Sequence, residues 1–104
     1  MDLLRNATAT GAGDAIRALR SKKTFQAAGA TTSGAGAATI TAEGSNNATK
    51  LGWVTLGTIT LTLATTSSTD ALVVDSPYLF VRGNLTAISG TGASITMTMG
   101  ETNA

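Results

Sequence analysis

The sequence predicts an all-β fold: an antiparallel β-sandwich with jelly-roll-like connections and an extended N-terminal arm. Two segments, residues 58–63 (TITLTL) and 95–99 (ITMTM), alternate Ile, Leu or Met with Thr. Because successive side chains of a strand point to opposite faces, each segment has one apolar face and one polar, β-branched face. Strand-like runs recur at roughly 8–12-residue spacing with turn residues between them, which is typical of sandwiches and jelly rolls. The predicted division is an arm over residues 1–13 and one sandwich domain over residues 14–104.

The predicted strands number roughly six to eight. The longest, residues 53–63, changes register at Gly57, because Val54 and Leu56 are even-numbered while the later apolar residues are odd-numbered. A bulge at this glycine would return both sets to the core. Residues 15–19 form a strand or, since they also fit a helical period, one helical turn. The other predicted strands are residues 23–28, 38–43, 71–74, 78–88 and 95–99.

Three Gly-rich segments share the order Ser/Thr-Gly-x-Gly, at residues 10–13, 33–36 and 89–92. Each is expected to join two strands, since Gly supplies the positive φ of tight turns. None completes the Gly-x-Gly-x-x-Gly pattern of a phosphate-binding loop. Turn-forming residues also predict a turn at residues 44–47 and a polar loop at residues 65–70, with a corner at Pro77.

The composition points away from catalysis. The chain has 104 residues, 4% of them aromatic and 12% charged, with no His and no Cys. Such a chain makes one domain with a thin core, which association with other chains can stabilise. Without His or Cys the usual general bases and nucleophiles are missing, so we expect no enzyme activity and no cofactor. The acidic residues are expected in turns or at the termini, facing water, without the spacing of a calcium loop. They are Glu43, Asp70, Asp75 and Glu101.

No segment approaches the roughly 20 apolar residues of a membrane-spanning helix, and the first residues lack the pattern of a signal peptide. We therefore expect no membrane partner. The net charge of +1 also argues against general nucleic-acid binding, which needs a strong basic field.

The charge is unevenly distributed along the chain. Residues 1–23 carry a net charge of +3, whereas residues 24–104 carry −2. The basic segment could steer docking onto an acidic partner, or its lysines could simply protect a solvated edge strand. Arg82 could bond to Asp75 at the edge of the core or reach a neighbouring subunit. The candidate partner-contact residues are Leu3, Leu4, Arg5, Arg17, Arg20, Lys22, Lys23 and Arg82.

The few aromatic residues allow two interpretations. Trp53 and Phe80 are expected in the core, because so few aromatics are available to fill it. Alternatively they could stack on a ligand together with Tyr78 and Phe25, as in carbohydrate-binding sandwiches.

Three segments, residues 43–47 (EGSNN), 53–59 (WVTLGTI) and 75–92 (DSPYLFVRGNLTAISGTG), occur in an order that resembles small structural proteins of tailed bacteriophages. The resemblance covers about residues 23–100 and implies a role in virion assembly. It favours a capsid cement or decoration protein that bridges subunits of the major capsid protein and associates with itself as a dimer or trimer. The expected location is the capsid surface, and the host cytoplasm during assembly. The alternatives are a head or tail fibre component, a tail adaptor, or a carbohydrate-binding module for attachment to the host.

Overall fold

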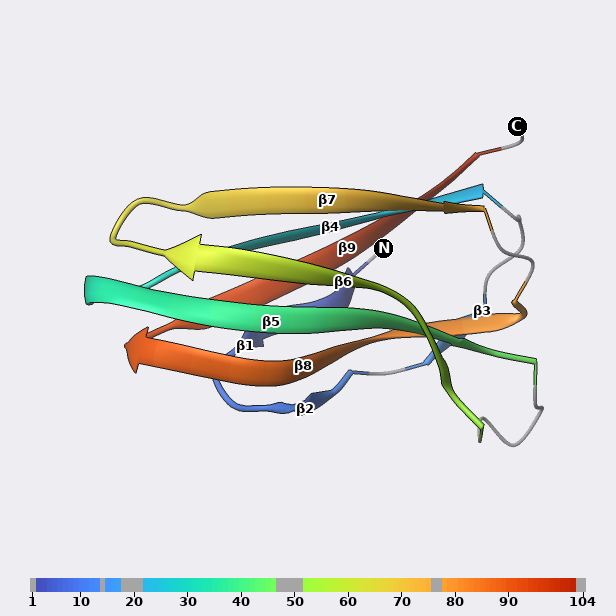
Figure 1. The fold of residues 1–104 in the computed structure, drawn as a ribbon, viewed down its shortest axis with the longest axis horizontal. Helices are drawn as coiled ribbons and strands as arrows, with labels where there is room; N and C mark the ends of the chain where they lie inside the picture. The colour runs from blue at the N-terminus through green and yellow to red at the C-terminus, as the bar shows by residue number, and fades with distance from the viewer. Residues whose placement is uncertain (1, 14, 18–21, 47–51, 76–77, 103–104) are drawn as a thin grey trace.

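The computed structural model describes residues 2–13, 15–17, 22–46, 52–75 and 78–102, and this part of the chain is built from β-strands (Figure 1). It contains no helix, and hence none that is long and apolar enough to cross a membrane. The strands are β1 (Asp2–Ala7), β2 (Gly11–Ala12), β3 (Ile16–Arg17), β4 (Lys22–Ala30), β5 (Ser33–Ser45), β6 (Val54–Leu63), β7 (Ser68–Asp75), β8 (Phe80–Thr91) and β9 (Ser94–Thr102).

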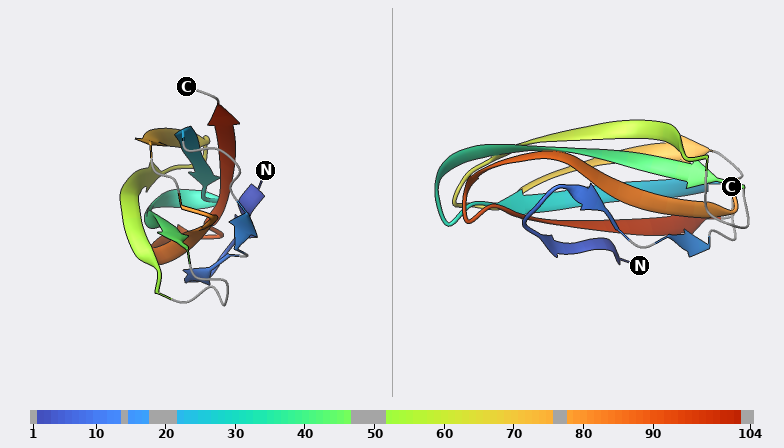
Figure 2. Two further views of the ribbon diagram at one scale, coloured as in Figure 1. Left: turned by 90° about the vertical axis from the view of Figure 1, so that its right-hand side faces the viewer. Right: turned by 90° about the horizontal axis from the view of Figure 1, so that it is seen from below.

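The strands form two antiparallel sheets that pack face to face, which confirms the predicted all-β, two-sheet architecture. Sheet A has the order β1-β9-β4-β7, and sheet B has the order β2-β8-β5-β6. The short strand β3 pairs with the same strand as β2, namely β8. The two layers are visible in the edge-on views of Figure 2. The molecule measures 40 × 27 × 18 Å.

The strand pairs are nested along the chain. The innermost pair is β5 with β6, and around it lie β4 with β7, then β2 and β3 with β8, and finally β1 with β9. The chain is therefore folded as one long antiparallel hairpin whose two arms are rolled into two sheets. The rolling also pairs β4 with β9 and β5 with β8.

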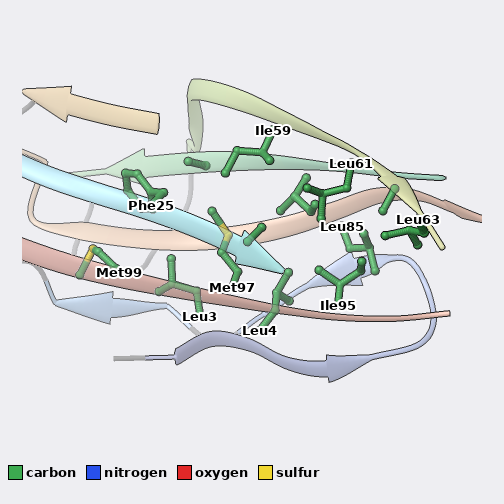
Figure 3. Close-up of a cluster of buried hydrophobic side chains, with 14 of the residues drawn as sticks. Leu3, Leu4, Phe25, Ile59, Leu61, Leu63, Leu85, Ile95, Met97 and Met99 are labelled. Carbon is green, nitrogen blue, oxygen red and sulfur yellow. The ribbon is translucent and has the colours of Figure 1, made fainter. Parts of the chain in front are cut away.

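Alternation of apolar and polar residues builds the core, as predicted. In β6 the side chains of Ile59, Leu61 and Leu63 are buried, while the intervening threonines are exposed. In β9 the residues Ile95, Met97 and Met99 are buried in the same way. Figure 3 shows these side chains meeting between the two sheets. The other buried apolar residues are Leu3, Leu4, Phe25, Ala27, Ala38, Ile40, Ala42, Val81, Leu85 and Ala93.

The predicted irregularity near Gly57 is confirmed. The ladder between β5 and β6 shifts register there, since Ala42 pairs with Gly57 but Glu43 pairs with Thr55. The extra residue, Leu56, packs against the core. Val54 remains 46% exposed. Of the two even-numbered apolar residues, the bulge therefore returns only Leu56 to the core.

The N-terminal segment differs from the prediction of an extended arm. Residues 2–7 form β1 and pair with β9, and residues 11–12 pair with β8. Leu3 and Leu4 are buried in the core, and an added Cβ at Gly83 would lie 3.4 Å from Leu4 and 2.6 Å from the sulfur of Met97. The absence of a side chain at Gly83 thus makes room for Met97, the residue paired with Leu4 in the β1–β9 ladder. Burial of two leucines explains why this segment lies along the sandwich.

The Gly-rich segments also behave differently from one another. Residues 89–92 do contain a turn, with positive φ at Gly90 and Gly92, but it links β8 of sheet B to β9 of sheet A. Residues 11–12 form β2 between two non-strand residues, and residues 33–36 lie within β5, where Gly34 has the predicted positive φ. At Gly36 the reason is close packing: an added Cβ would collide with the carbonyl oxygen of Ser89 on β8.

Of the two alternatives for residues 15–19, the described part agrees with the strand: Ile16 and Arg17 form β3. Two smaller predictions are corrected. Gly44 and Ser45 of the predicted turn belong to β5, whose pairing with β8 continues through them. The predicted loop at residues 65–70 ends early because β7 begins at Ser68. Asn47 and Pro77 lie outside the described residues.

Candidate functional site

The predicted partner-contact residues near the N-terminus divide into exposed and buried ones. Arg5 on β1 and Arg17 on β3 are exposed, each at an edge of its sheet. Leu3 and Leu4 are only 3% and 7% exposed, so the prediction that they contact a partner is wrong for this fold. Their apolar side chains fill the core of their own chain instead.

The prediction that Lys23 contacts a partner is also wrong. Lys23 is fully buried, so it is not a surface contact. It lies two residues before the buried Phe25, and the period of two places both on the inner face of β4. The backbone of Lys22 belongs to β4, and Arg20 lies outside the described residues.

Arg82, the last predicted contact residue, lies on the outer face of sheet B. Its neighbours on β8, Val81 and Gly83, are buried on the inner face, so Arg82 points outward. Its partner is not Asp75, as considered from the sequence, but Glu43 on β5: Nε donates to Oε1 at 2.7 Å. The two residues are directly paired in the β5–β8 ladder, which sets this contact.

Glu43 is held from three sides. Its Oε2 accepts hydrogen bonds from Nδ2 of Asn84 and from Oγ1 of Thr41, each at 3.2 Å. The side chain of Glu43 is 12% exposed and that of Arg82 is 25% exposed, so the ion pair is largely shielded from water. The expectation that Glu43 faces water in a turn is therefore wrong, because the residue lies inside β5 and among donors.

An aromatic ring completes the group. The guanidinium carbon of Arg82 lies 4.4 Å from the ring centroid of Trp53, within the range of a cation–π contact. Arg82 is thus oriented both by the carboxylate of Glu43 and by the indole of Trp53. We call this group the Arg82 cluster. Its members are Thr41, Glu43, Trp53, Arg82 and Asn84.

The cluster has the chemistry of recognition. The bond to Glu43 uses Nε–H, one of five N–H donors that an arginine carries in a planar fork. The remaining donors suit a carboxylate or a backbone carbonyl of a partner. Both carboxylate oxygens of Glu43 are already hydrogen-bonded within the chain. The described residues contain no group of three or more His, Cys, Asp and Glu side chains that could hold a metal ion.

Threonines surround the cluster on the same face. Thr39 pairs with Thr60 and Thr41 pairs with Thr58, so adjacent strands carry threonines side by side. Thr86 on β8 adds another hydroxyl and donates it to the carbonyl of Thr39 at 3.1 Å. The outer face of sheet B is therefore a β-branched polar surface with one charged, aromatic cluster toward the end of β6 that contains Val54.

The aromatic residues do not form an exposed row. All four lie among the described residues: Phe25 is fully buried, while Trp53, Tyr78 and Phe80 are half-buried. Phe25 is the one at the centre of the core, whereas Trp53 and Phe80 had been expected there. Trp53 instead packs against Arg82.

The sequence contained part of the signal for this site. In the predicted strand over residues 38–43, the period of two puts Thr41 and Glu43 on the face opposite to Ile40. Nothing in the sequence indicated that β5 and β8 are neighbours, so the pairing of Glu43 with Arg82 was missed. That pairing depends on strand order.

Comparison of the chain with protein-family models, with curated proteins and with solved structures finds no match.

Proposed function

We propose that the chain is a structural protein of a tailed-bacteriophage virion, a cement or decoration protein that binds subunits of the major capsid protein and stabilises the mature shell. The virion role rests on the resemblance of residues 23–100 to small structural proteins of tailed bacteriophages. The structural observation that supports binding to a protein is the Arg82 cluster on the threonine-lined outer face of sheet B. Arg and Trp are the residue types most enriched among the energetically dominant contacts of protein interfaces. A half-buried Arg already oriented by its own chain loses little conformational entropy on binding.

The surface around the cluster supports binding to a protein. The exposed threonines are uncharged and short, which lets a second surface approach closely. The indole of Trp53, which packs on Arg82, supplies the aromatic and apolar area of this surface. An apolar and aromatic centre within a polar surround is the common anatomy of protein interfaces.

A carbohydrate-binding module is the competing function. It requires aromatic rings exposed in a row for sugar stacking, and none of the four aromatic side chains is fully exposed. A fibre component or tail adaptor shares the proposed binding chemistry but differs in its place in the virion. The proposed role is binding without catalysis, on the capsid surface, after synthesis in the host cytoplasm.

We assign the connectivity to the jelly-roll class. The support is the nested pairing described above: counting β2 and β3 as one interrupted strand gives eight strands in two sheets of four. An arm that reaches a neighbour is not part of the proposal, because β1 fills the core of its own chain.

The function is tested with purified capsid shells that lack this chain. Wild-type protein is expected to bind the shells and to raise their temperature of disruption, since a ligand specific for the mature lattice stabilises it by mass action. Arg82→Ala is expected to weaken binding about tenfold or more. Thr24→Ala, on the outer face of sheet A, is the matched control and is expected to bind like the wild type. Equal binding by Arg82→Ala, with its fold intact by circular dichroism, would contradict the proposed surface.

A further inference from the structure

The edges of the two sheets are protected unequally. Unpaired backbone groups at a sheet edge invite pairing with another strand, and proteins guard against this with charges, bulges or very short strands. Three of the edges have such guards. In sheet A, β7 carries the exposed Asp70, and β1 carries the exposed Arg5 and two register shifts. At one edge of sheet B, β2 and β3 have only two residues each.

The remaining edge, β6, has a bulge only near its start, at Leu56, and no guard from Thr58 to Leu63. Its ten residues, VTLGTITLTL, include no charged residue and no proline. In the described part of the chain, β6 pairs only with β5, and no strand pairs with its other side. The threonines at 58, 60 and 62 are exposed along this strand. Strand β7 packs across from it in the other sheet but forms no ladder with it.

The backbone groups of alternate residues point to the open side of β6. The carbonyl of Thr62 accepts a hydrogen bond from Oγ of Ser68 on β7 at 2.7 Å, so it points away from β5, and one of its two lone pairs is left for a second strand. In an antiparallel strand the N–H and C=O groups of successive residues point alternately to the two neighbouring sides. Those of Thr58 and Thr60 therefore point to the same open side as the carbonyl of Thr62. The other side of the ladder agrees, because the carbonyl of Thr39, which is paired with Thr60, faces β8 and accepts from Thr86.

The segment from Thr58 to Thr62 is complementary to itself. If a second copy pairs antiparallel about a two-fold axis at Thr60, that residue lies opposite its own counterpart and Thr58 lies opposite Thr62 of the other copy. Ile59 then lies opposite Leu61 on the inner side. Cross-strand Thr–Thr pairs are among the favourable pairs of β-sheets. An identical copy also brings no like charge to this edge, because the strand carries none.

We infer that the chain forms a two-fold symmetric dimer through antiparallel pairing of β6 with β6 of a second copy. The two copies of sheet B then join into one continuous sheet. Because the unguarded edge is used by both partners, the pairing closes at two chains and leaves the guarded edges outside. The inference depends on the strand alone and stands whether or not the chain binds a capsid.

The dimer places the Arg82 clusters of both copies on one face. A two-fold axis perpendicular to the joined sheet keeps both outer faces on the same side. The dimer therefore presents two Arg82 clusters on one surface. If the proposed function holds, one dimer can bridge two subunits of a shell.

The oligomeric state of the purified full-length chain tests the inference. Sedimentation velocity across a concentration series is expected to show a dimer for the wild type. Thr60→Lys places two like charges at the two-fold axis and is expected to raise the dimer dissociation constant about a hundredfold. Thr24→Lys adds the same charge at an exposed position of sheet A and is expected to remain dimeric. A wild type that is monomeric throughout, or a Thr60→Lys variant that dimerises normally, would overturn the inference.

Cross-linking tests the register without destabilising the fold, because the chain has no native cysteine. In Thr60→Cys the two thiols face each other across a pair with Cα atoms about 5.5 Å apart, within the roughly 4.4–6.8 Å that a disulfide spans. In Thr58→Cys the two copies are offset by four residues, or about 13 Å along the strands. Rapid oxidative dimerisation is expected for Thr60→Cys and not for Thr58→Cys. Equal rates for the two variants would refute the register.

Discussion

Replacing Leu3 and Leu4 together by alanine is expected to lower the free energy of unfolding by about 3 kcal/mol or more. Both side chains are buried, and Leu4 is paired with Met97, the residue for which Gly83 leaves room. Truncation leaves a cavity on the β1 side of the core and removes the apolar contacts that hold β1 against β9. Urea unfolding at one protein concentration measures the change.

Arg5→Ala is the control for the same strand, since its side chain is exposed. It is expected to change stability by about 0.5 kcal/mol or less. The comparison distinguishes an integral strand from a detached arm. If the double leucine variant were as stable as the wild type, the first residues would be an arm in solution, as the sequence alone predicted.

Phe25→Ala is expected to cost about 3–5 kcal/mol. Phe25 is fully buried on β4, between the neighbouring strands β7 and β9 of sheet A, and it is the one aromatic side chain wholly inside the core. A domain of this size has about 5–15 kcal/mol of stability in total. The variant is therefore expected to be partly unfolded at room temperature, and thermal unfolding followed by circular dichroism measures the loss.

Val73→Ala provides the comparison for Phe25→Ala. Val73 lies on the adjacent strand β7 and is 64% exposed, so its truncation is expected to be nearly neutral. Similar losses in the two variants would mean that Phe25 is not at the centre of the core. The pair of variants thus tests where the interior of the sandwich lies.

The strands of the core were predictable because alternation is a local property. The run from Thr58 to Leu63 and the run from Ile95 to Met99 each specify a buried and an exposed face without reference to the rest of the chain. The change of register near Gly57 was predictable for the same reason. Charge misled the prediction at Lys23, because the strand period places it inward despite its charge.

The candidate site was less predictable because it depends on which strands are neighbours. Glu43 and Arg82 are 39 residues apart in the chain and meet only because β5 and β8 pair in register. The N-terminal segment was missed for a related reason. Its leucines looked like those of a free arm, and they are buried because β1 pairs with β9 at the other end of the chain.

The unguarded edge of β6 was likewise invisible until the strand order was known. The sequence shows that β6 has no charged residue, but an uncharged segment is equally typical of a central strand. Only its place at the edge of sheet B turns that composition into a surface for pairing. The same order puts the Arg82 cluster and this edge on one sheet, so the two proposed interactions are geometrically linked.

The most direct test of the proposed role is the copy number of the chain in purified particles of a bacteriophage that encodes it. Quantitative mass spectrometry would compare it with the major capsid protein. A copy number comparable with that of the major capsid protein is the result that a cement or decoration role predicts. A copy number far below it would place the chain in the portal, neck or tail, and absence from the particle would contradict a virion role altogether.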